Sequence, residues 1–128
     1  MTRLCLLAIA AGFLLPLSAT THAQGACQIN LNGIFTIYET AKKAYVTLNL
    51  TQNGTTITGT ATGVRNGQIS NGSLTGRHVT FTVTWPSGTA GLYSWKVNSA
   101  GALANGQTQD VGDPHSASAL TSKSKFCQ

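Results

Sequence analysis

The chain has 128 residues, of which 41% are hydrophobic and 9% are charged, and its formal net charge is +5. This length allows one domain with a hydrophobic core rather than two. The cations are scattered, with Lys42-Lys43 as the only adjacent pair, so the chain lacks the basic stripe with interleaved aromatic residues that marks a nucleic-acid surface. We therefore expect no nucleic-acid partner, and only weak attraction to anionic surfaces.

The first residues, 1 to 23, have the pattern of a signal peptide. Arg3 precedes an apolar run over residues 4 to 17, and Thr21-His22-Ala23 fits a small-x-Ala cleavage site. A membrane span needs about 20 apolar residues, which this run does not reach, and no later stretch approaches that length. We expect residues 24 to 128 to form a single mature domain, secreted or periplasmic, with no transmembrane segment.

Two cysteines, Cys27 and Cys127, stand at the extreme ends of this mature chain, because Cys5 leaves with the signal. In an exported protein such a pair predicts a disulfide. It would close a loop of about 100 residues, for which the chain-entropy model gives about 4 to 5 kcal/mol. The alternative, lipidation of Cys27 after Gln24-Gly25-Ala26, would leave Cys127 without a partner.

Alternating apolar and polar residues predict strands along the rest of the chain. In the clearest strand Val79, Phe81, Val83 and Trp85 face one way and threonines face the other. No segment has a 3.6-residue apolar stripe long enough for a helix of three turns. The predicted strands cover residues 33–40, 44–50, 55–62, 68–70, 73–76, 79–85, 91–98 and 102–109, with a last one near 117–123.

Asn-Gly, the strongest short hairpin signal, occurs five times between these strands, beginning at Asn32, Asn53, Asn66, Asn71 and Asn105. Asn53-Gly54 separates two well-patterned strands and predicts a turn, whereas Asn105-Gly106 fits a bulge within a hairpin. Short sequential turns favour an up-and-down meander. We predict an all-β fold of about eight antiparallel strands closed into a small barrel, since closure removes exposed edges; a β-sandwich is the alternative.

A recurring cadence of Leu-x-Leu, a Gln-x-Gly turn and Thr-Gly-Thr resembles the strand–turn rhythm of small barrels of the avidin and lipocalin type. It covers roughly residues 33 to 110, and the latter half of the chain also resembles uncharacterised exported bacterial proteins. The avidin resemblance implies that Trp85 helps to wall a ligand pocket. It does not extend to biotin binding, because Phe35 stands where avidins have a tryptophan and their polar ligand-binding positions are unmatched. The cadence runs through 48–54, Thr58-Gly59-Thr60, Leu74-Thr75-Gly76, 82–85 and 91–95.

Catalytic and metal chemistry has little support in this sequence. Beyond the signal, the only histidines are His78 and His115, and the only carboxylates are Glu39, Asp110 and Asp113. They have no metal-ligand spacing, no nucleophile elbow is present, and nothing pairs the carboxylates for glycoside hydrolysis. Asp113-Pro114-His115 has the pattern of a turn. We expect no catalytic residues, no metal, no cofactor and no enzyme activity.

The aromatic residues Trp85, Tyr93 and Trp95 lie on two consecutive predicted strands and could meet across them. They are the candidate ligand-binding residues, with ordinary core packing as the alternative. The leading hypothesis is a secreted, non-enzymatic barrel that binds a small apolar or carbohydrate ligand or presents its loops to a protein partner. The alternatives are a hydrolase inhibitor that uses a free segment at residues 24 to 30, and an envelope-associated structural protein.

Overall fold

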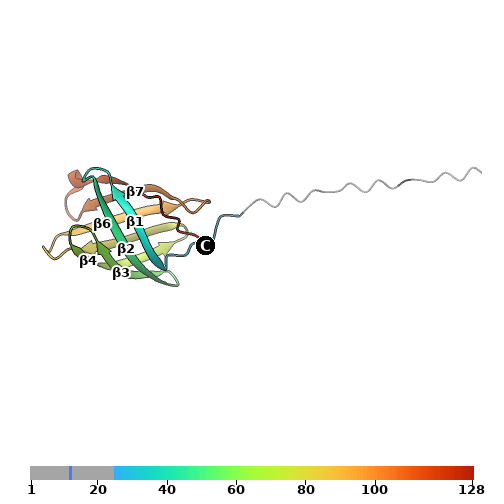
Figure 1. Cartoon of the computed structure of the whole chain (residues 1–128), viewed down its shortest axis with the longest axis horizontal. Coiled ribbons are helices and arrows are strands. Elements are labelled where there is room, and N and C mark those ends of the chain that lie inside the picture. Colours follow the sequence, from blue (N-terminus) through green and yellow to red (C-terminus); the bar gives the residue numbers. More distant parts are fainter. Residues whose placement is uncertain (1–11, 13–24) are drawn as a thin grey trace, which may run out of the picture.

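Eight antiparallel strands form a closed barrel in which each strand pairs with its neighbours in the sequence (Figure 1). The computed structural model describes Gly12 and residues 25 to 128, so the expected signal peptide over residues 1 to 23 lies outside the described residues. The predicted meander barrel is confirmed, and the sandwich alternative is wrong. The elements are β1 (Gly33–Glu39), β2 (Ala44–Asn53), β3 (Thr56–Thr62), β4 (Asn66–Thr75), β5 (His78–Thr84), β6 (Ala90–Val97), β7 (Leu103–Asp110), the 3-10 helix η1 (Pro114–Ser116) and β8 (Ser118–Thr121).

The core fills the inside of the barrel with the inward-facing half of each alternating strand. Val79, Phe81 and Val83 of β5 are buried as the sequence predicts, while the threonines between them face out. Apolar side chains of this size each contribute about 1.5 to 3 kcal/mol when fully buried. In the described part of the chain, no helix is long and apolar enough to cross a membrane.

One strand differs from its prediction. The sequence predicts two short strands at residues 68–70 and 73–76, but β4 runs through both. Asn71-Gly72 between them makes a β-bulge: Asn71 has a φ of 52°, and the register with β5 shifts between Ser70 and Ser73. A bulge adds a residue without ending the strand. Asn71-Gly72 has the sequence pattern of a turn, but it forms a bulge within one continuous strand.

The two ends of the barrel differ. Four connections, at residues 40–43, 63–65, 85–89 and 111–117, surround one end, here called the open end. At the other, closed end the described start of the chain meets the C-terminus (Figure 1). There Phe126 is fully buried, and the predicted disulfide joins Cys27 to Cys127 across a sequence separation of 100 residues.

The segment before β1 is held along its length at the closed end. The Cys27 amide donates to the Ser99 carbonyl at 3.1 Å, the Asn30 amide donates to the Phe126 carbonyl at 2.9 Å, and Ile29 forms a β-bridge with Cys127. The expectation of a free segment over residues 24 to 30 is therefore wrong from Cys27 onward, while Gln24 lies outside the described residues. Disulfide and main-chain bonds together hold it against the barrel.

Candidate functional site

The open end contains a hollow of about 300 Å³, the lower limit of ordinary ligand pockets. Three of the four open-end connections contribute to its wall, so charged and aromatic side chains from separate parts of the sequence meet there. Its lining includes Glu39, Lys42, Val64, Arg65 and Trp85.

Trp85 provides the aromatic surface of this hollow. It continues the inward alternation of β5 one residue beyond the strand and is half-buried. Its indole lies over glycines: a Cβ atom on Gly67 would lie 2.9 Å from Trp85 Cε3 and 2.5 Å from Val83 Cγ1, and one on Gly63 would lie 3.9 Å from Trp85 Cη2. Because Gly67 has no side chain, the indole can lie against β4.

Beneath the hollow, Glu39 is a buried carboxylate, with 2% of its surface exposed. It ends β1 on the same face as Phe35 and Ile37, and its Oε1 accepts a hydrogen bond of 2.6 Å from the Tyr93 hydroxyl. Burial, and then the hydrogen bond and negative charge of Glu39, raise the pKa of Tyr93 above its usual value. Tyr93 therefore remains a protonated donor at physiological pH.

Lys42 lies above this pair. Its Nζ is 3.6 Å from Glu39 Oε2 and 3.8 Å from Asp110 Oδ1, both longer than an N–H···O hydrogen bond. The attraction is therefore coulombic, and the three ammonium donors stay available to a ligand. Arg65 is exposed and, among the described residues, has no carboxylate within salt-bridge distance. Two cations with unused donors thus border Trp85.

The three predicted aromatic residues do not form one site. Tyr93 stacks with Phe81 at a ring-centroid distance of 5.3 Å, Trp95 meets Phe81 edge to face at 5.4 Å, and Trp95 also contacts Phe126 at 5.4 Å. Trp95 has no exposed surface. Its side chain fills the barrel core at the place where an internal ligand would have needed a cavity. Of the three, Trp85 lines the open-end hollow, and Tyr93 reaches it only through Glu39.

Glu39, Lys42 and Arg65 were not predicted as site residues. The alternation that places Phe35 and Ile37 inward also places Glu39 inward, and a carboxylate in register with a core face is a detectable signal. Lys42 and Arg65 lie in the first and third connections, which an up-and-down meander places at the same end of the barrel, but the sequence carries no signal that their side chains border Trp85.

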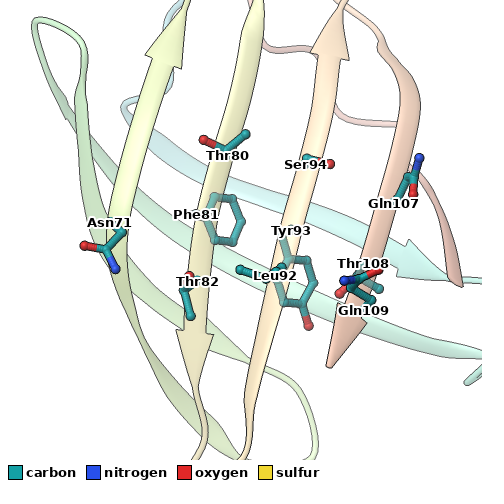
Figure 2. Close-up of a pocket in the computed structure, with 10 residues that line it drawn as sticks. All are labelled: Asn71, Thr80, Phe81, Thr82, Leu92, Tyr93, Ser94, Gln107, Thr108 and Gln109. Atoms are coloured by element: carbon teal, nitrogen blue, oxygen red, sulfur yellow. The ribbon is translucent and has the colours of Figure 1, made fainter. Parts of the chain in front are cut away.

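A second hollow, of about 440 Å³, lies on the outer wall over β4 to β7. Figure 2 shows its residues, which come from four adjacent strands. Leu92 lies at its centre, paired with Thr82 on one side and Gln109 on the other. Its outward side chains are otherwise uncharged hydroxyls and amides, without the charged groups that make the open end chemically selective.

The histidines take no part in the open-end hollow. Asp113 Oδ1 accepts a 3.1 Å hydrogen bond from the His115 amide, which confirms the predicted turn. His78 begins β5 at the closed end, the opposite end of the barrel from His115. Within residues 25 to 128, no three His, Cys, Asp or Glu side chains are grouped so that they could hold a metal ion.

Comparison with known proteins gives no family for this chain: no protein-family model, curated protein or solved structure matches it. The structure supports the architectural part of the resemblance to avidin- and lipocalin-type barrels: eight antiparallel strands in meander order form a closed barrel. The open-end site therefore has to be interpreted from its own geometry.

Proposed function

We propose that this protein is an exported, non-enzymatic binding module that holds a small carbohydrate ligand at the open end of its barrel. The observation that carries the proposal is the half-buried indole of Trp85, which lies against Gly67 and borders the hollow beside donors that no protein group uses. An aromatic face packs against the C–H face of a sugar ring, while surrounding polar groups fix its orientation.

The polar groups favour a sugar that carries a carboxylate over a purely apolar ligand. Lys42 and Arg65 supply charged donors at the rim, where charge-assisted hydrogen bonds are strongest. Ser87 and Thr89 add hydroxyls on the side of Trp85. The hollow of about 300 Å³ suits a single sugar unit rather than a long chain.

Two further observations agree with this proposal. The disulfide between Cys27 and Cys127 suits the oxidising compartments outside the cytosol. The resemblance to avidin-type barrels implies a pocket-lining role for the same tryptophan, Trp85. Neither observation identifies the ligand. Its chemistry is inferred from the charged and aromatic side chains of the open end.

Trp85 and Trp95 are the only tryptophans, and nuclear magnetic resonance can follow their two indole N–H signals separately. We expect galacturonate or glucuronate to shift the Trp85 signal, glucose to shift it less, and Trp95 to stay unchanged. Trp85→Leu removes that signal, so its sugar binding is measured by calorimetry and should be lost, whereas Trp95→Phe should keep the shift of the Trp85 signal. If no sugar moves the Trp85 signal, or if the shifts gather around Leu92 on the outer wall, the proposal is wrong.

A second candidate function is the presentation of open-end loops to a protein partner, which includes hydrolase inhibition. Val64 is 99% exposed and Val111 is 55% exposed, and both belong to open-end loops. Burial of these side chains against a partner would remove apolar surface from water. Val111→Ser, at a position outside the lining of the hollow, should weaken capture of such a partner but leave the sugar response of Trp85 intact, which separates the two functions.

A further inference from the structure

The charges of the barrel are separated along its axis. Among residues 25 to 128, three cations and all three Asp and Glu side chains lie at the open end, where their charges cancel. These are Lys42, Lys43 and Arg65 with Glu39, Asp110 and Asp113. The other four cations have no Asp or Glu side chain on their part of the barrel: Arg77, Lys96, Lys123 and Lys125.

Local structure holds these cations in place. The Arg77 guanidinium donates to the backbone carbonyls of Cys27, Val97 and Asn98 at 2.9, 2.8 and 2.6 Å, so its charge is solvated by dipoles but not cancelled. Lys96 is exposed on β6, directly opposite His78 of β5. The positive potential of this region therefore extends to solvent.

The C-terminal tail adds two lysines in a fixed orientation. The Thr36 amide donates to Ser124 Oγ at 3.1 Å, and Ser122 Oγ donates to the Thr36 carbonyl. Because these two serines face β1, the residues that alternate with them, Lys123 and Lys125, lie exposed on the outside.

An exposed aliphatic side chain accompanies these lysines. Ile34 of β1 is 71% exposed. The bond from Thr36 to Ser124 and the bond from Asn30 to Phe126 bracket it, which places it beside the tail at Lys125. Lysines with an aliphatic neighbour suit a lipid headgroup layer, where the ammonium groups meet phosphates and the apolar atoms enter the interface.

We propose that a cationic face, formed by Ile34, Lys96, Lys123 and Lys125 with Arg77 beside them, docks onto an anionic lipid surface. Most of these side chains surround the closed end of the barrel, from the end of β6 to the tail beside the start of β1, which fits an extended surface better than a single polyanion chain in a groove. Docking in this way leaves the neutral open end directed away from the lipid, and does not depend on what that end binds.

The experiment is sedimentation of the purified protein with vesicles of phosphatidylglycerol and phosphatidylcholine, compared with phosphatidylcholine alone. We expect binding only to the anionic vesicles, weakened when salt rises from about 0.05 to 0.5 M because exposed charges are screened. Lys96→Gln, Lys123→Gln and Lys125→Gln together should weaken binding at least about tenfold, since each lysine near such a surface contributes about 1 kcal/mol. Ile34→Ser should weaken it a few-fold.

The matched control removes three charges from the open end instead, through Lys42→Gln, Lys43→Gln and Arg65→Gln. Its vesicle binding should stay within about twofold of wild type, and circular dichroism should show both triple variants folded. Equal losses in the two variants would mean that net charge alone attracts the protein, and would overturn the proposed face. Failure of the wild type to bind anionic vesicles, or binding to soluble alginate with none to vesicles, would overturn it as well.

Discussion

At the scale of single residues, a missing side chain shapes the open end. A Cβ atom on Gly67 would approach Val83 Cγ1 to 2.5 Å and Trp85 Cε3 to 2.9 Å, whereas one on Gly63 would have no contact closer than 3.8 Å. Gly67→Ala should therefore lower the free energy of unfolding by about 1 to 3 kcal/mol through overpacking. It should also shift the Trp85 indole signal.

Gly63→Ala is the control, since it adds the same methyl group in ordinary contact. Its effect on the free energy of unfolding should be below about 1 kcal/mol, measured by urea denaturation of both variants. Equal effects at the two positions would contradict the role assigned to Gly67.

The Tyr93–Glu39 hydrogen bond gives a second prediction at this scale. Tyr93→Phe leaves a buried carboxylate oxygen without its donor, which should lower the free energy of unfolding by about 1 to 3 kcal/mol at pH 7. Tyr45→Phe is the control: Tyr45 is 67% exposed, so removal of its hydroxyl should change little. A loss no larger than that of the control would mean that the bond does not stabilise the fold.

The same pair predicts an alkaline loss of stability. The raised pKa of Tyr93 means that the folded protein keeps a proton that the unfolded chain releases above its ordinary pKa of 10.0. Stability is unaffected below that pH and falls above it, at up to about 1.4 kcal/mol per pH unit for one proton. Between pH 9 and 11, wild type should lose roughly 1 kcal/mol more than Tyr93→Phe; parallel pH profiles would contradict this.

At the scale of elements, the seam between β1 and β8 is the least regular part of the barrel. β8 has four residues, and only two of its positions pair with β1. Beyond them Ser122 and Ser124 bond to the Thr36 main chain in place of a strand. Side-chain hydroxyls thus complete the closure that a longer β8 would have provided.

Ser122→Ala with Ser124→Ala should therefore open the seam locally. We expect faster hydrogen exchange at the Thr36 amide, because its 3.1 Å bond to Ser124 Oγ is lost, and a loss of about 1 to 2 kcal/mol in global stability. Ser70→Ala, at an exposed position on β4, is the control. An unchanged hydrogen-exchange rate at the Thr36 amide would contradict this prediction, because it would mean that water replaces the serine hydroxyls with no loss of local stability.

Sequence patterns predicted the strands better than the turns. Asn53-Gly54 does lie at a hairpin, but Gly54 with a φ of 61° begins a two-residue loop, as in a type II′ turn. Asn71 and Asn105 have positive φ inside strands and form bulges. Asn-Gly reports tolerance of positive φ, which turns and bulges share, so only the register between strands distinguishes them.

At the scale of the whole molecule, the site was less predictable than the barrel. Alternation indicates which residues face inward but not how far along the axis they lie. Trp85, Tyr93 and Trp95 share the inward face, yet Trp95 is enclosed by Phe81 and Phe126 while Trp85 reaches the open end. Phe126 closes the barrel from the tail, and that long-range contact has no local signature in the sequence.

The disulfide gives the last prediction, because it joins the two ends of the described fold. Cys27→Ala with Cys127→Ala frees a loop with a sequence separation of 100 and should lower the free energy of unfolding by up to about 4 to 5 kcal/mol, measured by urea denaturation. The main-chain bonds of Cys27 and Asn30 and the bond from Arg77 remain, so the variant should fold at low temperature. Because Trp85 lies at the opposite end, its sugar response should survive in the folded variant. A lost response with a native circular dichroism spectrum would mean that the closed end controls the open one.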